Sequence, residues 1–131
     1  MSRYVLDTSA YSHFMRGDTE AVELIDSADW IGIPTVVLGE LWVGFLLGRR
    51  SQENEQELQE FLANPAVAIV DITTQVSRTY ADIVVALREA GTPIPVNDIW
   101  VAASAVTAGA SVLTYDSHFR SVRRAASIVL S

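Results

Sequence analysis

Cysteine and lysine are both missing from this sequence of 131 residues, and each absence removes a class of chemistry. Without cysteine the chain has no disulfides, no zinc sites built on thiolates and no thiol nucleophile. Because all nine basic residues are arginine, the phosphate-binding loop Gly-x-x-x-x-Gly-Lys is excluded as well. The serine-nucleophile pattern Gly-x-Ser-x-Gly does not occur either. Any catalysis therefore has to rest on carboxylates and on the two histidines, His13 and His118.

The sequence also has no run of residues that is typical of a membrane span. The stretch from Trp30 to Gly48 has a single charge, but it contains one proline and four glycines. The stretch from Ile99 to Tyr115 is uncharged but short and rich in small residues, whereas a span needs about 20 strongly apolar residues. No long apolar segment follows the first residues, so no secretory signal is expected. With the lack of cysteine, these features favour a protein of the cytoplasm that does not enter a membrane.

Size and charge set two further expectations. Half of the residues are hydrophobic, which is enough for one compact core, so we expect a single domain over residues 1–131. The net charge of −7 argues against general electrostatic attraction as the main source of affinity for nucleic acid. Contact with nucleic acid would therefore depend on a few local groups.

Apolar runs and helical patterns alternate along the chain and indicate an α/β fold. Short buried strands are predicted at residues 4–7, 30–33, 67–70, 111–114 and 127–130. Helices are predicted at 10–15, 18–28, 35–47, 51–63 and 74–90, from a cap at Asn97 or Asp98 to about 109, and at 116–124. Such alternation with short links predicts a central parallel β-sheet flanked by helices. Sites in sheets of this kind form at the carboxyl ends of the strands.

Four of the sixteen acidic residues stand in apolar sequence, where an unpaired carboxylate is costly to bury. They are Asp7, Glu40, Asp98 and Asp116. Asp7 and Asp116 lie where predicted strands end, so both are expected at the functional edge of the sheet. By contrast, the glutamates between residues 53 and 60 belong to an amphipathic helix and are expected to face solvent.

Each of the four acids also has a purely structural explanation. Asp7 and Asp98 could cap the helices that follow them, and Asp116 could belong to a turn. Glu40 falls in the second turn of its predicted helix, which is too far from the helix start for capping. Its alternative is an exposed position, or a salt bridge with one of the two arginines that end that helix.

Taken together, the four acids indicate a metal site. Carboxylates that cluster at one edge of a sheet repel one another and are tolerated when a cation lies between them. Oxygen ligands of this kind suit Mg²⁺, with Mn²⁺ as an alternative. One or two such ions can bind a phosphate, activate water and stabilise the leaving oxygen, which is the chemistry of phosphodiester hydrolysis.

Four segments of the chain resemble the motifs of PIN domains, and most of all those of the VapC toxins of toxin–antitoxin pairs. In order, they are Val5–Ser9, the helix Thr35–Gly44 with Glu40, Asn97–Ala103 and Val112–Phe119. One motif alone would be weak, but the four occur in the expected order and spacing over the whole chain.

The resemblance implies a PIN-like fold and an Mg²⁺-dependent endoribonuclease, the toxin of a VapBC-type module. The implied metal ligands and water-activating groups are the same four acids, Asp7, Glu40, Asp98 and Asp116. Neighbouring polar side chains would orient these ligands or the water, or would serve only in turns and caps. These side chains are Thr8, Ser9, Asn97 and Thr114. The resemblance also implies an RNA substrate, a cognate VapB-like antitoxin that occupies the active-site groove, and a homodimer.

One position departs from the family pattern. Many relatives carry a second acid two residues after the aspartate of the fourth motif, and this chain has His118 there. Losing that carboxylate weakens the expectation of a second tightly held metal ion. His118 could contact phosphate or ligate Mn²⁺ better than Mg²⁺, but a lone histidine is more often a surface residue.

Two groups of side chains are candidates for contacts with partners. Arginines near the motifs could bind RNA phosphates or simply favour helix ends. They are Arg120, Arg123, Arg124, Arg49 and Arg50. Large apolar residues crowd the helix that carries Glu40, where the core is their expected place and a groove for an antitoxin helix is the alternative. They are Trp42, Phe45, Leu46 and Leu47.

Two other functions stay open from the sequence. A catalytically weak PIN domain could bind RNA or a protein as a regulatory module. A receiver-like signalling domain also places acids at the end of a parallel sheet, but it relies on a lysine beside the acceptor aspartate, and this chain has none. The sequence therefore favours RNA cleavage by four carboxylates and a divalent ion.

Overall fold

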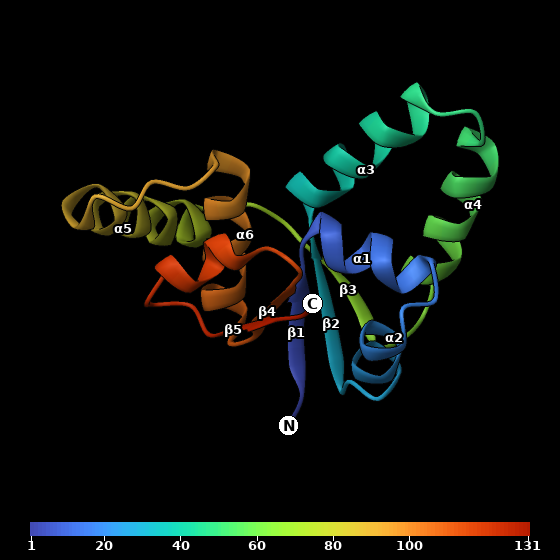
Figure 1. The fold of residues 1–131 in the computed structure, drawn as a ribbon, viewed down its shortest axis with the longest axis horizontal. Coiled ribbons are helices and arrows are strands. Elements are labelled where there is room, and N and C mark those ends of the chain that lie inside the picture. The colour runs from blue at the N-terminus through green and yellow to red at the C-terminus, as the bar shows by residue number, and fades with distance from the viewer.

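A five-stranded parallel sheet forms the centre of the computed structural model, which describes residues 1–131 (Figure 1). The strands are β1 (Arg3–Leu6), β2 (Trp30–Pro34), β3 (Val67–Val70), β4 (Ser111–Thr114) and β5 (Ser127–Val129). Their order across the sheet is β3-β2-β1-β4-β5, and every neighbouring pair is parallel. The predicted parallel α/β sheet is therefore confirmed.

The first three strands of the chain form the centre and one side of the sheet, and the last two strands form the other side. β1 lies in the middle and pairs with β2 on one side and with β4 on the other. In open α/β sheets, ligands bind at the carboxyl ends of the strands where the strand order reverses in this way. Asp7 directly follows β1, and Asp116 lies two residues after β4, so both acids stand at this switch point.

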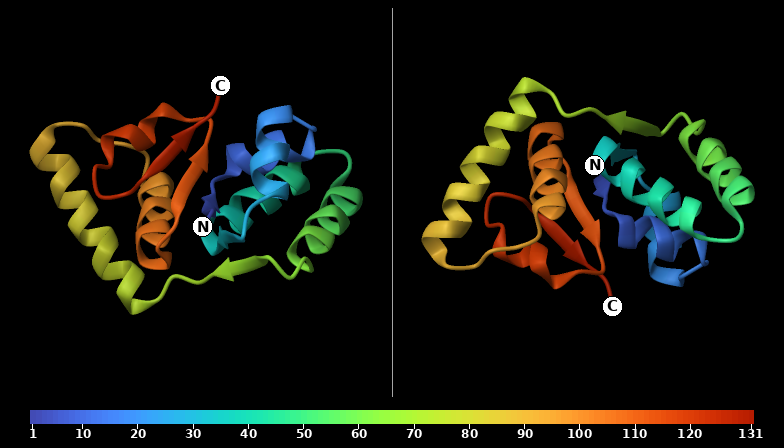
Figure 2. Two further views of the ribbon diagram at one scale, coloured as in Figure 1. Left: turned by 90° about the horizontal axis from the view of Figure 1, so that it is seen from below. Right: turned by 90° about the horizontal axis from the view of Figure 1, so that it is seen from above.

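Six α-helices and a short 3₁₀ helix flank the sheet (Figure 2). They are α1 (Thr8–Met15), α2 (Thr19–Asp26), α3 (Thr35–Leu47), α4 (Ser51–Leu62), α5 (Thr74–Ala90), α6 (Val96–Ala108) and η1 (Ser117–Ser121). α6 packs against β1, β2 and β4, and α5 packs along α6. α3 and α4 form a hairpin at the opposite end of the molecule from α5. None of these helices combines the length and the apolar character that crossing a bilayer requires.

The central strands are buried on both faces. Val5 and Leu6 of β1 and Val112 and Leu113 of β4 have no exposed surface, and successive residues of a strand point to opposite faces. This is why these strands are continuous apolar runs in the sequence rather than alternating ones. The buried hydrophobic residues of the strands and helices form one cluster, which holds the ends of β1 and β4 in fixed positions.

Two helices that follow an aspartate at the end of a strand differ from the predicted ones. α1 begins at Thr8, two residues before the predicted start, since the Asp7 carboxylate accepts a hydrogen bond from the Ala10 N–H. The helix predicted at 116–124 is only the short η1, whose start is capped by Asp116. The capping considered for Asp7 is thus confirmed, and it fixes a carboxylate at the end of a strand.

α6 starts earlier than predicted. Pro95 precedes its first residue, Val96, and has a backbone φ of −56°. Proline suits a helix start because its φ is already fixed there and its missing N–H is not needed. The prediction that Asn97 or Asp98 caps this helix was therefore wrong, and both side chains project from its first turn.

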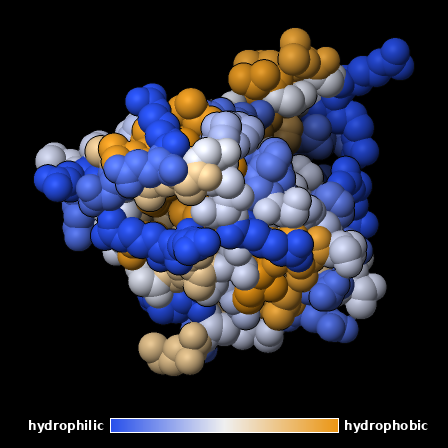
Figure 3. Space-filling view, turned by 60° about the vertical axis from the view of Figure 1, so that its left-hand side comes forward, coloured by the Kyte–Doolittle hydropathy of each residue, from blue (hydrophilic) through white to orange (hydrophobic).

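The second half of α3 is exposed, although its large apolar residues were expected in the core. Trp42 is 38% exposed, Leu46 78% and Leu47 85%, and Phe45 alone of the group packs partly against the core. α3 projects beyond the sheet, so its outward face has nothing to pack against (Figure 1). Figure 3 shows hydrophobic surface at the upper end of the molecule, where α3 projects. We call the exposed residues Trp42, Val43, Leu46 and Leu47 the α3 patch.

Gly32 in β2 has no room for a side chain. A Cβ atom added there would lie 2.5 Å from Trp30 Cη2 and 2.9 Å from Val70 Cγ2. We expect Gly32→Ala to lower the free energy of unfolding by about 1–3 kcal/mol, through overpacking. Urea unfolding followed by tryptophan fluorescence measures this change.

Gly44→Ala is the matched control for that substitution. No atom lies within 4 Å of a Cβ added at Gly44 in α3, and alanine should raise the free energy of unfolding by roughly 0.5–1 kcal/mol. If Gly32→Ala were as stable as wild type, Trp30 and Val70 would have to move aside without cost, contrary to this packing.

Candidate active site

Asp7 is the buried centre of a hydrogen-bond network at the end of β1, with only 5% of the residue exposed. Its Oδ1 accepts hydrogen bonds from the Ala10 N–H (2.9 Å) and the Ser9 hydroxyl (2.7 Å). Its Oδ2 accepts one from the Thr114 hydroxyl at 2.5 Å. Because α1 starts directly after β1 and Thr114 ends the neighbouring β4, the fold itself supplies these donors. Oδ2 accepts a single hydrogen bond, which leaves a lone pair for a cation.

Two hydroxyls tie the ends of β1 and β4 together. The Thr114 hydroxyl donates to Asp7 and accepts a hydrogen bond from the Asp116 N–H at 2.9 Å. The Ser9 hydroxyl donates to Asp7 and accepts one from the Tyr115 N–H at 2.9 Å. Each hydroxyl thus donates a hydrogen bond to the buried carboxylate and accepts one from a backbone N–H of the loop after β4. These are the contacts that the orienting role expected of Ser9 and Thr114 requires.

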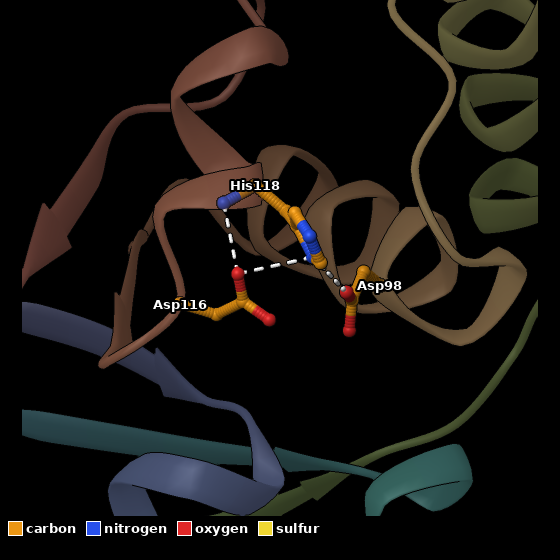
Figure 4. Close-up of side chains that lie close together, drawn as sticks. All are labelled: Asp98, Asp116 and His118. Carbon is orange, nitrogen blue, oxygen red and sulfur yellow. Dashed lines mark hydrogen bonds and ion pairs between the residues drawn. The ribbon is translucent and has the colours of Figure 1, made fainter.

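Asp98, Asp116 and His118 come together from two elements (Figure 4). Asp98 projects from the first turn of α6, whereas Asp116 and His118 belong to the loop after β4 and to η1. His118 Nδ1 lies 3.0 Å from Asp116 Oδ1 and 3.5 Å from Asp98 Oδ2. One ligand atom from each of the three residues lies within 4.8 Å of the other two. His118, expected to be a surface residue, is partly exposed, but its ring faces two carboxylates.

Glu40 lies at the rim of this group and is linked to it through two polar neighbours. Its Oε1 accepts a hydrogen bond from the Thr8 hydroxyl at 2.8 Å, and its Oε2 accepts one from the Asn97 amide at 3.3 Å. Thr8 directly follows Asp7, and Asn97 directly precedes Asp98. All four acids singled out in the sequence therefore lie at the same edge of the sheet.

The five candidate arginines differ in their contacts. Arg124 forms an ion pair with Asp82 of α5 at 3.0 Å, and Arg50 pairs with Glu53 at the start of α4. A salt bridge between Glu40 and an arginine at the end of α3 does not form, so that alternative was wrong. The remaining candidates are exposed and form no ion pair: Arg49, Arg120 and Arg123.

Burial and mutual repulsion raise the pKa values of two of the acids. Burial is the main cause of the raised pKa of Asp7; its hydrogen bonds oppose the shift, and the charge of Asp116 adds to it. Burial also raises the pKa of Asp98, against the hydrogen bond with His118 and together with the charges of Asp116 and Asp7. The three aspartates thus act on one another, and a cation between them would relieve the repulsion.

The donor set of this edge fits a divalent ion. Asp98 and Asp116 offer carboxylate oxygens, and Asp7 Oδ2 keeps an unused lone pair. Oxygen ligands of this kind suit Mg²⁺ and Mn²⁺. His118 adds an imidazole nitrogen to the set, and Glu40 is hydrogen-bonded to Thr8 and Asn97, the sequence neighbours of Asp7 and Asp98.

A set of contacts made by Tyr115 and His13 beside the site was not predicted from the sequence. The Tyr115 ring stacks on His13 with the ring centroids 3.7 Å apart, and the Tyr115 hydroxyl donates to Asp18. His13 Nδ1 also lies 2.8 Å from the Ser9 carbonyl oxygen. These contacts hold the loop that carries Asp116 against α1. The only signal in the sequence was the aromatic residue next to that aspartate, and strand or helix periodicity does not register such a pairing.

A family model described as PIN domain matches residues 4–125, a range that includes all four acids. The chain belongs to the PIN-domain family. This PIN domain is similar to Ribonuclease VapC4 of Mycobacterium tuberculosis, with 33% identity over 91 residues that cover 70% of this chain and 69% of that protein. The predicted membership is confirmed.

Two crystal structures show how closely the fold agrees. This PIN domain is similar to VapBC2 from Rickettsia felis bound to a promoter DNA fragment, with a TM-score of 0.84 and 22% identity over 98% of this chain and 99% of that one. It is also similar to VapBC-5 of Mycobacterium tuberculosis, a member of the VapBC family of toxin-antitoxin systems. That match has a TM-score of 0.76 and 27% identity over 99% of this chain and 100% of that one. The PIN-like fold is confirmed.

Asp98→Asn tests the electrostatic cost of this site. Because the folded pKa of Asp98 is raised, ionising this carboxyl destabilises the folded PIN domain. The penalty is absent below the ordinary carboxyl pKa and appears as pH rises through the folded pKa. With a chelator present at mildly alkaline pH, we expect the variant to melt roughly 2–5 °C above wild type. The gain should shrink toward acidic pH.

Asp26→Asn is the control for the same change of charge, because Asp26 is exposed at the end of α2. Its melting temperature should stay close to that of wild type across the pH range. An Asp98→Asn protein that melts at or below the wild-type temperature in alkaline chelator would contradict the repulsion among the three aspartates.

Proposed function

We propose that this PIN domain is an Mg²⁺-dependent endoribonuclease, with Mn²⁺ as a possible replacement, and that it is the toxin of a VapBC-type module. The observation that carries the proposal is the convergence of Asp7, Asp98 and Asp116, with Glu40 at the rim, at the switch point of the sheet. A similar protein carries the name Ribonuclease VapC4, which supports the ribonuclease activity.

The four acids divide the work according to their surroundings. Asp7 is held in one orientation by three hydrogen bonds and, with Asp98 and Asp116, would hold the ion. A divalent ion held here would supply Lewis-acid chemistry, which favours binding of the phosphodiester and makes water a better nucleophile at neutral pH. Glu40, held by hydrogen bonds from Thr8 and Asn97, would accept the proton that the attacking water loses.

The polar neighbours keep this arrangement in place. Ser9 and Thr114 set the distance between the ends of β1 and β4, while Thr8 and Asn97 hold the Glu40 carboxylate from both of its oxygens. Replacing side chains that orient ligands in this way lowers metal affinity or activity about 10- to 100-fold. We propose that all four act as positioning residues.

Local positive charge offsets part of the net charge of −7 when RNA binds. Arg120 and Arg123 follow Asp116 closely, are exposed and form no ion pair, so they are the arginines best placed to bind phosphates. Arg124 is engaged by Asp82, and Arg49 and Arg50 follow the end of α3, whose last residue lies about 10 Å along the helix from Glu40. A longer RNA could reach that second pair as well.

Cleavage of single-stranded RNA by the purified protein tests the proposal. We expect cutting with Mg²⁺ or Mn²⁺, no cutting with a chelator, and a loss of roughly 100-fold or more in Asp116→Asn, because even orienting partners are worth about 10- to 100-fold. Asp26→Asn should cut like wild type. Activity that survives the chelator and Asp116→Asn would rule out this mechanism.

A catalytically weak domain that binds RNA or a protein is the second candidate. The contact of the His118 ring with both Asp98 and Asp116 is the observation that favours it. Tight RNA binding by the wild-type protein without cutting in either ion would support this module over the nuclease.

We propose that a VapB-like antitoxin covers the α3 patch. The residues of this patch are apolar and exposed on a helix that projects from the domain, which is typical of a surface that receives an amphipathic helix. Leu46 lies only about 9 Å along α3 from Glu40, so a segment bound there could continue to the rim of the active site. Similarity to VapBC-5, a member of a toxin-antitoxin family, supports such a partner.

Leu46→Glu tests this partner surface. Co-expressed with the protein of the neighbouring small reading frame, the variant should lose copurification of that protein by about tenfold or more, since it buries an unpaired charge. Val85→Glu on α5 is the control, because Val85 is similarly apolar and 53% exposed. Unchanged copurification with Leu46→Glu would contradict the proposal that the antitoxin covers the α3 patch.

The homodimer, the single domain over residues 1–131 and the cytoplasmic location stay predictions.

A further inference from the structure

His118 takes part in the acidic group through its backbone and its ring. Its N–H donates a hydrogen bond to Asp116 Oδ1 at 2.9 Å, which holds the residue beside that carboxylate. Its ring Nδ1 then lies 3.0 Å from the same oxygen and 3.5 Å from Asp98 Oδ2 (Figure 4). The ring has solvent on one side, with 49% of the side chain exposed, yet its nitrogen faces the two acids.

We infer that His118 Nδ1 is a metal ligand that makes this site prefer Mn²⁺ over Mg²⁺. The inference rests on the proposed metal site, but it concerns which ion the site selects. Asp98, Asp116 and His118 can each direct one ligand atom to a common point, and the three come from two elements fixed by α6 and β4. The site therefore offers nitrogen as well as oxygen.

A mixed nitrogen and oxygen set discriminates between the two ions. Mg²⁺ takes oxygen ligands in near-ideal octahedral geometry and gives up its waters reluctantly. Imidazole suits first-row transition ions, and affinity at sites with nitrogen and oxygen ligands rises from Mn²⁺ onward through the series. A neutral imidazole in place of a carboxylate weakens the electrostatic attraction for both divalent ions alike. The nitrogen donor is therefore what shifts the preference toward Mn²⁺.

The competing explanation is that the His118 ring takes the place of a cation. Nδ1 would then donate a hydrogen bond to Asp116 or Asp98 and would have to leave before an ion binds. The two explanations make opposite predictions. A ligand strengthens Mn²⁺ binding, whereas an internal counter-ion weakens the binding of every divalent ion.

Electron paramagnetic resonance of Mn²⁺ separates these outcomes without any RNA. The metal-free protein is titrated with Mn²⁺, and Mg²⁺ is then added as a competitor. We expect wild type to bind Mn²⁺ at least about tenfold more tightly than Mg²⁺. His118→Asp should lower that ratio by about tenfold, mainly through tighter Mg²⁺ binding, and His118→Ala should weaken Mn²⁺ binding. Because His118 is partly exposed on η1, both variants should fold.

Pulsed measurements on the same samples detect the ligand directly. Wild type should show hyperfine coupling between Mn²⁺ and a nitrogen, and both His118 variants should lose it. Asp26→Asn is the control, because Asp26 is exposed at the end of α2 and makes no contact with the acids or with the loop that carries Asp116. It should keep the coupling and the wild-type ratio. No nitrogen coupling in wild type, an unchanged ratio in His118→Asp, or tighter Mn²⁺ binding in His118→Ala would each overturn the inference.

These results are distinguishable from a failure of the proposed nuclease. A protein that shows the nitrogen coupling but cuts no RNA retains the role of His118 and loses the proposed activity. A protein that cuts RNA equally well with both ions and shows no coupling retains the activity and loses the role of His118.

Discussion

The buried carboxylate of Asp7 is the constraint on which the rest of the site depends. A buried charge needs hydrogen bonds, and here the donors come from α1 and from the neighbouring strand β4. Two of these donors, Ser9 and Thr114, also accept hydrogen bonds from the loop after β4. The same contacts that satisfy Asp7 therefore set the position of Asp116.

The acids of the candidate active site lower the stability of the folded domain. Asp7 and Asp98 have raised pKa values because they are buried near other acids, so their ionised forms cost folding energy. Acids concentrated in this way are typical of functional sites, where chemistry and stability make different demands. Helices rather than loops carry two of the four acids: Asp98 stands on α6 and Glu40 on α3, which limits how far their backbones can move.

Much of the fold and of the site could be predicted from local patterns. Apolar runs indicated all five strands, and the runs are continuous in the inner strands because these are buried on both faces. The acids were recognisable because a charge in apolar sequence is out of place unless it has a role. Boundaries were harder, as the early starts of α1 and α6 show, since they depend on the Asp7 cap and on Pro95. The exposure of Leu46 was not predictable, because hydrophobicity alone favours burial.

The sequence by itself determined which residues are apolar, which carry charge, and in what order strands and helices follow. Only the tertiary structure decided which of them meet. Asp7 and Thr114 are over a hundred residues apart in the chain and touch because β1 and β4 are neighbours in the sheet. His118 faces Asp98 because α6 packs beside η1, and the α3 patch stays exposed because that helix extends past the sheet. Contacts of this kind follow from strand order and helix packing, which no local pattern of residues encodes.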